Sequence, residues 1–346
     1  MSGCGDTADG ADGAVDSAAT GGDGSGTGGS GTGTGGDGTG TGGTVAGTGG
    51  GGVDKSGPRG EGYLPTYRDM NPANYDFATM THLCIAFANP TGNGSESEFA
   101  NTNPTVVQTL IDAAHAQGVK VLASIAGAAG GGPVEAQIAP GTVDAYVTGL
   151  LDLVARYGLD GIDVDIEGEH VKPATYEPFV KKLSAALPAE ALLTVAVANW
   201  NGDDFPDGAL AEYDFINIMS YDHCGPWNPN CEHSSLASTN EDVAYWANDR
   251  GIAADRLVIG VPFYGYCFGS ACESEAYTYA DLVSRYPEAR TTDWIEKPNM
   301  TFTLNSATTI ATKAELAKTY GGVMIWELGQ DATGADSLFK VIADAQ

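Results

Sequence analysis

Residues 159–167 read LDGIDVDIE, a run in which acidic and β-branched residues alternate. In an extended strand alternate side chains share a face, so Asp163, Asp165 and Glu167 point one way and the aliphatic residues between them point the other. Successive carboxyls are then about 6.6 Å apart along the backbone, at roughly 3.3 Å per residue. At this spacing the carboxyls couple, and at least one stays protonated near neutral pH. The run therefore predicts a strand that carries a proton donor beside acids that stabilise positive charge.

Two other interpretations of the acidic run are open. The acids could form a solvated face of an acidic protein, or they could hold a magnesium or calcium ion through carboxylate oxygens. The aliphatic alternate positions and the apolar stretch at residues 146–159 favour acids that face inward or into a cleft. No second cluster of oxygen ligands stands out in the sequence, so we expect no bound metal and no cofactor.

Outward from this run, short apolar segments alternate with longer amphipathic ones. The expected strands are 61–65, 81–88, 119–127, 161–167, 192–199, 215–222, 257–265 and 321–328. The helix-like segments between them are 103–118, 143–158, 175–188, 241–251 and 309–321. Eightfold alternation of strand and helix predicts a parallel (β/α)8 TIM barrel, an α/β fold, over residues 58–346.

The first 57 residues have a different composition. They hold 24 of the 49 glycines, mixed with Thr, Ser, Ala and Asp, and such a segment cannot bury enough apolar surface to offset its ordering entropy. We expect residues 1–57 to form a disordered Gly-rich tether. Near its start, MSGCGD resembles the end of a bacterial lipoprotein signal, which would make Cys4 lipidated; a chance cysteine is the alternative.

The formal net charge is −29, of which −6 lies in the first 57 residues. A charge of this sign repels polyanions at long range, so nucleic acid and bare anionic membrane are excluded as partners. A neutral or cationic substrate is favoured, although the same charge would also suit a saline habitat or solubility. No segment is apolar and long enough to cross a bilayer. We therefore expect membrane attachment only through a lipid on Cys4.

Cysteine usage indicates an oxidising compartment. Two pairs close short rings in expected loops, Cys224 with Cys231 and Cys267 with Cys272, as local disulfides do. Cys84 lies in an expected strand and reads as a buried core thiol. The alternative for the first pair is a zinc site with His223 and His233, although their spacing matches no common zinc module. An extracytoplasmic location follows, as a secreted or cell-surface lipoprotein.

Polar and aromatic residues recur where the expected strands end. In a (β/α)8 barrel these ends meet at one mouth, where active sites lie. The residues concerned are Asn89, Ser124, Glu167, Asn199, Trp200, Tyr221, Asp222, Tyr264, Trp326 and Glu327. Aromatic rings stack on the C–H faces of sugars, so Tyr63, Trp200, Trp227, Tyr221, Tyr264 and Trp326 favour a sugar-binding cleft. The alternative is that several of these rings fill the barrel top as core or loop anchors.

At this point the sequence resembles glycoside hydrolase family 18, the chitinase family. DGIDVDIE at 160–167 matches the family's D-G-x-D-x-D-x-E signature at every fixed position. MSYD at 219–222 resembles the family's sixth-strand motif, and Trp326 matches the Trp that ends the eighth strand. GYLPTYR at 62–68 and SIAG at 124–127 resemble the first- and third-strand motifs.

The resemblance implies a retaining mechanism in which the substrate's own acetamido oxygen attacks the anomeric carbon. It implies that Glu167 is the general acid and base, that Asp165 binds the acetamido N–H, and that Asp163 shares a proton with Asp165. Tyr221 would hold the acetamido oxygen, Asp222 would bind the sugar, and Trp326 would form the floor beneath it. The other implied residues are Tyr63 and Ser124, which support Asp163, and Met219, Trp200 and Tyr264, which complete the substrate-binding set.

The sequence departs from the family pattern at three places. Ala126 stands where the third-strand motif usually has a glycine, and Tyr266 stands where many relatives have Arg. About 55 residues separate the seventh and eighth expected strands, too few for the full α+β insertion that deepens the groove in processive relatives. We therefore expect a shallower, more open cleft, suited to endo cleavage or to a bulky branched substrate.

Three functions remain open at this stage. The first is an endo-acting chitinase on β-1,4-linked N-acetylglucosamine, in chitin or chito-oligosaccharides. The second is an endo-β-N-acetylglucosaminidase that cuts the chitobiose core of N-glycans. The third is a non-catalytic sugar-binding protein, against which the presence of Glu167 argues. In each case the expected partner is a neutral N-acetylglucosamine-containing polysaccharide or glycan.

Overall fold

A computed structural model describes residues 59–345 except 92, 93 and 95. The predicted tether over residues 1–57 and the lipidation expected at Cys4 lie outside these residues and stay predictions.

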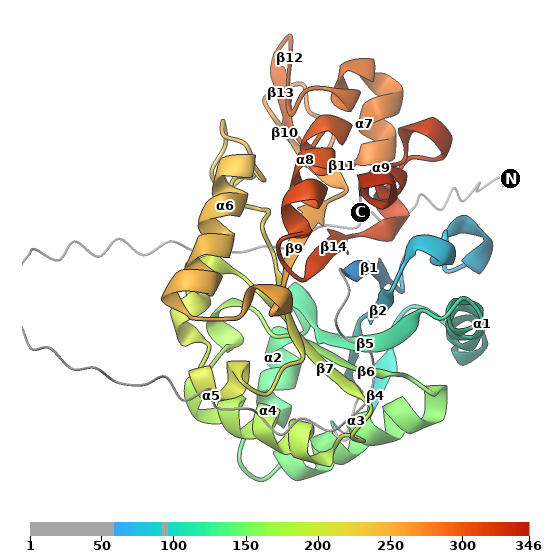
Figure 1. The fold of residues 1–346 in the computed structure, drawn as a ribbon, viewed down its shortest axis with the longest axis vertical. Helices are drawn as coiled ribbons and strands as arrows, with labels where there is room; N and C mark the ends of the chain where they lie inside the picture. The colour runs from blue at the N-terminus through green and yellow to red at the C-terminus, as the bar shows by residue number, and fades with distance from the viewer. Residues whose placement is uncertain (1–58, 92–93, 95, 346) are drawn as a thin grey trace, which may run out of the picture. The chain divides into compact units, whose positions relative to one another are not determined.

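The described part of the chain contains a closed barrel of eight parallel strands, in the order β1-β14-β9-β8-β7-β6-β5-β2 (Figure 1). The strands are β1 Arg59–Pro65, β2 His82–Ala86, β5 Lys120–Ala126, β6 Gly161–Asp165, β7 Leu192–Val197, β8 Phe215–Ile218, β9 Leu257–Pro262 and β14 Gly322–Trp326. All eight expected strands are present, and the predicted TIM barrel is confirmed.

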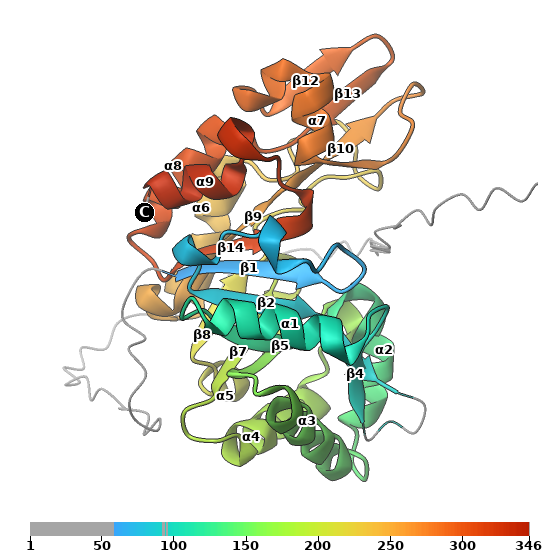
Figure 2. The same cartoon turned by 90° about the vertical axis from the view of Figure 1, so that its right-hand side faces the viewer.

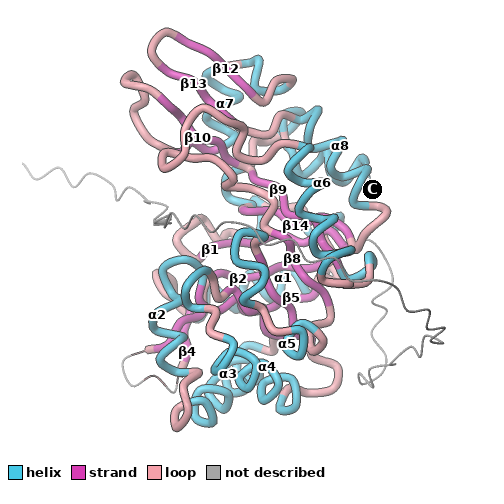
Figure 3. The backbone as a smooth tube through the Cα atoms, turned by 90° about the vertical axis from the view of Figure 1, so that its left-hand side faces the viewer, coloured by secondary structure: helices cyan, strands magenta, loops and turns pink. Residues whose placement is uncertain are grey.

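Helices cover the outside of the barrel, as the tube in Figure 3 shows. They are α1 Pro104–His115, α2 Gly127–Gln137, α3 Val143–Tyr157, α4 Pro173–Ala186, α5 Asp207–Leu210, α6 Leu236–Ala244, α8 Ala307–Ala317 and α9 Leu338–Ala345. Four of the five predicted helices are found within a few residues of their expected ends, as α1, α3, α4 and α8. The helix predicted over 241–251 begins earlier, as α6, and continues as a π-helical turn at Tyr245–Asp249. Helix α3 ends where Gly158 takes the left-handed conformation, the usual end signal of a helix. Helices α2, α5 and α9 were not predicted.

Two separate apolar clusters, one on each face of the barrel sheet, explain why residue types alternate along a strand such as β6. Ile162, Val164 and Ile166 belong to the larger cluster, which lies between the barrel and its helices. The smaller cluster includes Tyr63, Leu122, Phe215 and Met324 from different barrel strands and fills the interior. Residues on the other face of β6 therefore face the inside of the barrel, where Asp163 and Asp165 lie.

The segment between β9 and β14 corrects one expectation. It forms an antiparallel sheet in the order β11-β10-β13-β12, from β10 Tyr264–Phe268, β11 Ala276–Thr278, β12 Trp294–Lys297 and β13 Met300–Thr303, with helix α7 Tyr279–Arg285. Figure 2 shows this subdomain in orange, at the end of the molecule away from α3 and α4. The segment that was expected to be too short for the full α+β insertion thus carries a four-stranded sheet and one helix, because hairpins and one short helix need few residues. The expected shallow, open cleft rested on the absence of such an insertion and stays a prediction.

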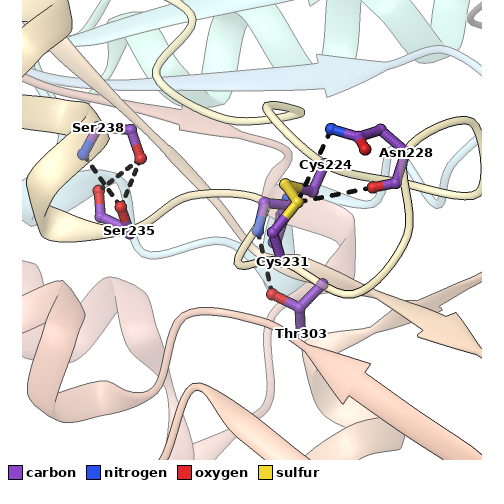
Figure 4. Close-up of a disulfide and its surroundings, with 7 residues drawn as sticks. Cys224, Asn228, Cys231, Ser235, Ser238 and Thr303 are labelled. Atoms are coloured by element: carbon purple, nitrogen blue, oxygen red, sulfur yellow. Dashed lines mark hydrogen bonds between the residues drawn. A yellow bond between two sulfur atoms is a disulfide. The ribbon is translucent and has the colours of Figure 1, made fainter.

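Both predicted disulfides are present, Cys224–Cys231, which Figure 4 shows, and Cys267–Cys272. The first contradicts the alternative of a zinc site, because its two sulfurs are bonded to each other. Cys84 is a free, buried thiol, as predicted. Over the described residues, none of the helices combines the length and apolarity that crossing a bilayer needs. A short hairpin, β3 Ala88–Pro90 and β4 Ser97–Phe99, follows β2.

Candidate active site

The acidic run lies on β6 and directly after it. Asp163 and Asp165 are buried side chains, while Glu167 is half-buried just beyond the end of the strand. The interpretation of the run as a solvated face is therefore wrong. In the parallel pairing with β5, Asp163 stands opposite Ser124 and Asp165 opposite Ala126.

Asp163 is held by three hydroxyl groups from three other strands. Its Oδ2 accepts hydrogen bonds from Tyr63 Oη at 2.8 Å and from Ser124 Oγ at 2.7 Å, and its Oδ1 accepts from Thr194 Oγ1 at 2.6 Å. Burial raises the pKa of Asp163, and these three donors act against that rise. Tyr63 and Ser124 were predicted in this role. Thr194 was not, although it occupies the position on β7 that pairs with Asp163.

Asp165 differs from Asp163 in having an unpartnered oxygen. Its Oδ1 is buried and forms no hydrogen bond within the described protein. Burial, followed by the charges of Glu167 and Asp163, raises the pKa of Asp165 well above its ordinary value. A buried carboxyl with a free oxygen is available to bind a polar group of a ligand.

Glu167 has the properties of an acid that works near neutral pH. Burial, followed by the charge of Asp222, raises the pKa of Glu167 to about 7. A general acid is most effective when its pKa lies near the working pH, because it is then protonated yet still able to release its proton. A pKa in this range suits the general acid that the sequence predicted at Glu167, and that role stays a prediction.

Asp222, which follows β8, is fixed by two tyrosines from the insertion. Its Oδ1 accepts hydrogen bonds from Tyr264 Oη at 2.5 Å and Tyr266 Oη at 3.0 Å, and His233 Nδ1 lies 3.6 Å away. Its backbone has a φ of 63°. Tyr266, noted above as a departure from the family pattern, therefore has a role at the site. His233 is buried; the sequence suggested it only as an alternative zinc ligand, because its position just before a helix start does not point to this site.

Tyr221 is a buried ring beside Tyr264, with 6.3 Å between ring centroids. Its hydroxyl donates to Met324 Sδ at 3.9 Å, a weak interaction that leaves the hydroxyl able to donate elsewhere. Its position between Asp222 and the interior of the barrel brings the Tyr221 hydroxyl into the same region as Asp165 and Glu167, whose charges both act on it.

Trp326 ends β14 and belongs to an aromatic group at the barrel mouth. Its ring stacks on Phe87, with centroids 5.9 Å apart and planes at 27°, and lies 5.7 Å from Tyr63. Phe87 was not predicted, because it lies one residue beyond an otherwise aliphatic strand. Trp326 is only partly buried.

The three remaining predicted residues, Trp200, Met219 and Trp227, lie in three different environments. Trp200 is 71% exposed, and its ring lies against Gly168, the residue after Glu167, where an added Cβ would meet it at 3.0 Å. Met219 packs against the interior cluster. Trp227 is 39% exposed and contacts Tyr266 edge-on at 5.4 Å, so it reaches the site through that tyrosine.

Asp160, the first acid of the signature, lies outside the site. Its carboxylate accepts hydrogen bonds from Val121 N at 2.8 Å and Lys120 Nζ at 2.7 Å and contacts His115 Nε2 at 2.8 Å. These contacts tie the start of β6 to β5 and α1. Asp160 is therefore a structural member of the motif.

The site offers a proton donor, buried acids, a tyrosine hydroxyl and an aromatic floor within one barrel mouth. Among the described residues, no three His, Cys, Asp or Glu side chains are arranged to hold a metal ion. In TIM-barrel enzymes the active site lies at the carboxyl ends of the barrel strands. The acids and aromatic rings described above lie at these ends. The chain belongs to the glycosyl hydrolases family 18, whose family model matches residues 61–331.

Solved structures and curated proteins agree with this assignment. The GH18 chitinase ChiB of Flavobacterium johnsoniae is 32% identical, with a TM-score of 0.75 over 84% of this chain and 94% of that one. A class V chitinase of Nicotiana tobaccum has the same fold, with 21% identity and a TM-score of 0.74 over 82% of this chain and 97% of that one.

Curated relatives include a chitinase-like effector of Moniliophthora roreri, 29% identical over 58% of this chain and 56% of its own length. The class V chitinase of Medicago truncatula is 22% identical over 78% of this chain and 85% of its own length. The chain spans about half the length of the first curated relatives it matches, from 44% to 56%.

Proposed function

We propose that this protein is a retaining glycoside hydrolase that cleaves β-1,4-linked N-acetylglucosamine in chitin or chito-oligosaccharides. The observation that carries the proposal is the pair Asp165 and Glu167: a buried carboxyl with an unpartnered oxygen beside an acid whose pKa is raised to about 7. The chitinases among its structural relatives support the substrate class, and the tobacco enzyme was solved in complex with NAG4.

In the proposed reaction the substrate supplies the nucleophile. Glu167 gives its proton to the glycosidic oxygen, and the acetamido carbonyl oxygen attacks the anomeric carbon as the glycosidic bond breaks. The product of this step is an oxazolinium ion, with the positive charge on the former acetamido group. Glu167, now a carboxylate, then takes a proton from a water molecule that attacks the anomeric carbon and reopens the ring. Two inversions at the anomeric carbon leave its configuration unchanged.

The other residues would stabilise that charged intermediate. Asp165 would pass its proton to Asp163 and, as a carboxylate, accept the N–H of the acetamido group. Tyr221 would donate its hydroxyl to the acetamido oxygen, and Asp222 would bind sugar hydroxyls. Trp326 would form the floor under the ring, and the exposed ring of Trp200 would contact the next sugar. Preorganised groups aimed at developing charge are generally the largest contribution to catalysis.

We also propose an extracytoplasmic location. The two disulfides support it, because such bonds persist in oxidising compartments. Whether the protein is free or held by a lipid on Cys4 is a question for mass spectrometry of the mature N-terminus. A lipid-modified Cys4 would establish the anchor, and an unmodified N-terminal segment would exclude it.

The test is the isosteric change Glu167→Gln, with Glu169→Gln, an exposed neighbour, as the matched control. We expect the first variant to lose about a thousandfold or more in turnover of chito-oligosaccharides, as expected for removal of a general acid, while it still binds them. The control should retain normal turnover. Equal turnover by wild type and Glu167→Gln would overturn the assignment.

The choice of substrates separates the remaining alternatives. Chitin oligomers and a high-mannose glycoprotein should be offered in parallel, with nuclear magnetic resonance to read the first-formed anomer. We expect cleavage of the oligomers with an initial β anomer. Preferential release of N-glycans would instead indicate an endo-β-N-acetylglucosaminidase, and binding without cleavage of either substrate would indicate a sugar-binding protein.

A further inference from the structure

A further buried acid lies inside the barrel and has no part in the proposed reaction. Glu61 is on β1, two residues before Tyr63, so the two side chains point to the same face of the strand. The Glu61 side chain is fully buried. The charge of Asp163 acts on Glu61, and Tyr63, whose hydroxyl donates to Asp163, lies on the same face of β1 as Glu61.

The two carboxyls have very unequal partners. Asp163 accepts three hydrogen bonds from hydroxyl groups, as described above. Glu61 Oε1 accepts one from the thiol of Cys84 at 3.0 Å, and a thiol is a weak donor. Glu61 Oε2 is buried without a hydrogen-bond partner. The donors that stabilise an ionised carboxyl are therefore concentrated on Asp163.

Two further groups act on Glu61 against the effect of burial, which is the larger. The amide of Asn217 on β8 acts on Glu61, and its Nδ2 donates to Tyr63 Oη at 3.1 Å. The charge of Arg59 also acts on Glu61, and the Arg59 guanidinium lies over the ring of Phe215 and donates to the carbonyls of Asp255 and Gly321. Two carboxylates in one buried environment cannot both ionise without a large cost.

We propose that Glu61 and Asp163 form a buried carboxyl pair in which Glu61 keeps the proton and Asp163 keeps the charge, which makes Glu61 a positioning residue. This inference rests on the proposed function, in which Asp163 must be free to receive the proton of Asp165. A neutral Glu61 leaves Asp163 as that acceptor. An ionised Glu61 would place a second negative charge beside Asp163, which would then already hold a proton.

The direction of the pKa shift agrees with this division. Burial, followed by the charge of Asp163, raises the pKa of Glu61 to about 8. Glu61 is then neutral at the pH where Glu167 acts and ionises only on the alkaline side. Above about pH 8 two ionisations, those of Glu167 and Glu61, would each reduce turnover.

The first experiment compares wild type with Glu61→Gln in chito-oligosaccharide hydrolysis. Glutamine resembles the neutral acid, so kcat at the optimum should stay within about twofold. Above pH 8 the logarithm of kcat should fall with a slope approaching −2 in wild type and −1 in the variant, a difference of about tenfold one pH unit higher. Loss of kcat by orders of magnitude at the optimum, or identical alkaline slopes, would overturn the proposal.

Two changes at Cys84 provide a matched pair with opposite expected shifts. Cys84→Ser supplies a stronger donor to Glu61, which stabilises the ionised carboxylate. The loss of kcat that follows the ionisation of Glu61 should therefore begin at lower pH. Cys84→Ala removes the donor, and that loss should begin at higher pH. Both variants alter the same buried position and should keep a similar kcat at the optimum. Shifts in the same direction would contradict the assignment.

A measurement without substrate separates this proposal from the proposed function. An acid whose folded-state pKa is raised binds its proton more tightly in the folded chain, so it stabilises the fold at low pH and loses that effect as pH rises through 8. The free energy of unfolding of wild type should therefore fall relative to Glu61→Gln between pH 5 and pH 8. Parallel curves for the two proteins would refute the protonated Glu61, even if the enzyme cleaves chitin.

Discussion

Glu167 and Asp222 illustrate how single residues set the chemistry of this site. The two acids belong to different strands, and the charge of Asp222 contributes to the raised pKa of Glu167. Tyr264 and Tyr266 hold Asp222 Oδ1 in place, so the distance between the acids is maintained by the insertion. At this scale function depends on the environment of each carboxyl, since elsewhere in the chain the same residue type forms a surface ion pair, as Asp144 does with Lys182.

The exchange Asp222→Asn tests this electrostatic coupling. The amide keeps an oxygen for both tyrosines but removes the charge, so the pKa of Glu167 should move down from about 7. Because Glu167 must be protonated to act, the alkaline fall of kcat/KM should move to lower pH, and kcat should drop as sugar binding weakens. A pH profile measures both effects. The control Tyr266→Phe keeps the charge of Asp222 and should leave the position of the alkaline fall unchanged, and an unshifted profile for Asp222→Asn would contradict the coupling.

Among the elements, the junction between β5 and α2 shows local sequence preferences overridden by packing. Helix α2 contains four glycines and an internal proline, and these residues disfavour a helix. Two glycines allow close contacts, because an added Cβ on Gly130 would meet Asn89 at 2.5 Å and one on Gly131 would meet His170 at 2.3 Å. Asn89 in turn bonds both Ala126 N and Ala126 O. The helix forms because it fits its neighbours.

Ala126 provides a prediction at this junction. It has a φ of 77° and ψ of −92°, a conformation that costs a residue with a Cβ about 1–2 kcal/mol. Glycine adopts positive φ freely, so Ala126→Gly should raise the free energy of unfolding by about 1 kcal/mol. Urea denaturation measures this change.

The adjacent exchange Gly127→Ala should have the opposite effect. Gly127 has a φ of 67°, and an added Cβ would meet the ring of Phe87 at 2.4 Å. That ring stacks on Trp326, so this variant should lose both stability and sugar affinity. Equal stability of the two variants would show that the backbone at this junction relaxes freely.

For the whole molecule, the barrel and the insertion together supply the site. The acids come from β6 and the end of β8, while two of the tyrosines come from β10 in the insertion. Both disulfides lie in segments next to these site residues, one in the loop after β8 and one at the end of β10. The formal net charge of the chain is −29, and a net charge acts at a distance only on charged ligands.

The net charge predicts how salt changes substrate use. The Michaelis constant for neutral chito-oligosaccharides should stay constant as ionic strength rises, since no long-range attraction is screened. For partly deacetylated oligomers, which carry positive amines, the Michaelis constant should rise with salt. Steady-state kinetics on matched oligomers at low and high sodium chloride would measure both. A parallel salt effect on the two substrates would show that the charge has no role in substrate capture.

The sequence alone predicted the barrel and the row of acids, because both depend on local periodicity. Alternation with a period of two places Asp163, Asp165 and Glu167 on one face wherever the strand lies, and eight strand–helix alternations leave few other folds. The support that Tyr63 and Ser124 give to Asp163 was predicted only through the resemblance to a known family. Neither route revealed the insertion sheet, whose strands are three to five residues long and lack clear periodicity.

Only the tertiary structure decided which groups meet inside the barrel. Thr194, Asn217, Phe87 and His233 carry no local signal, and they join the site because strands distant in sequence close into one barrel. The same closure brings Glu61 beside Asp163, 102 residues away along the chain. Residue type and spacing determine which face a side chain takes, but the pKa of a buried acid depends on neighbours that only the closed barrel supplies.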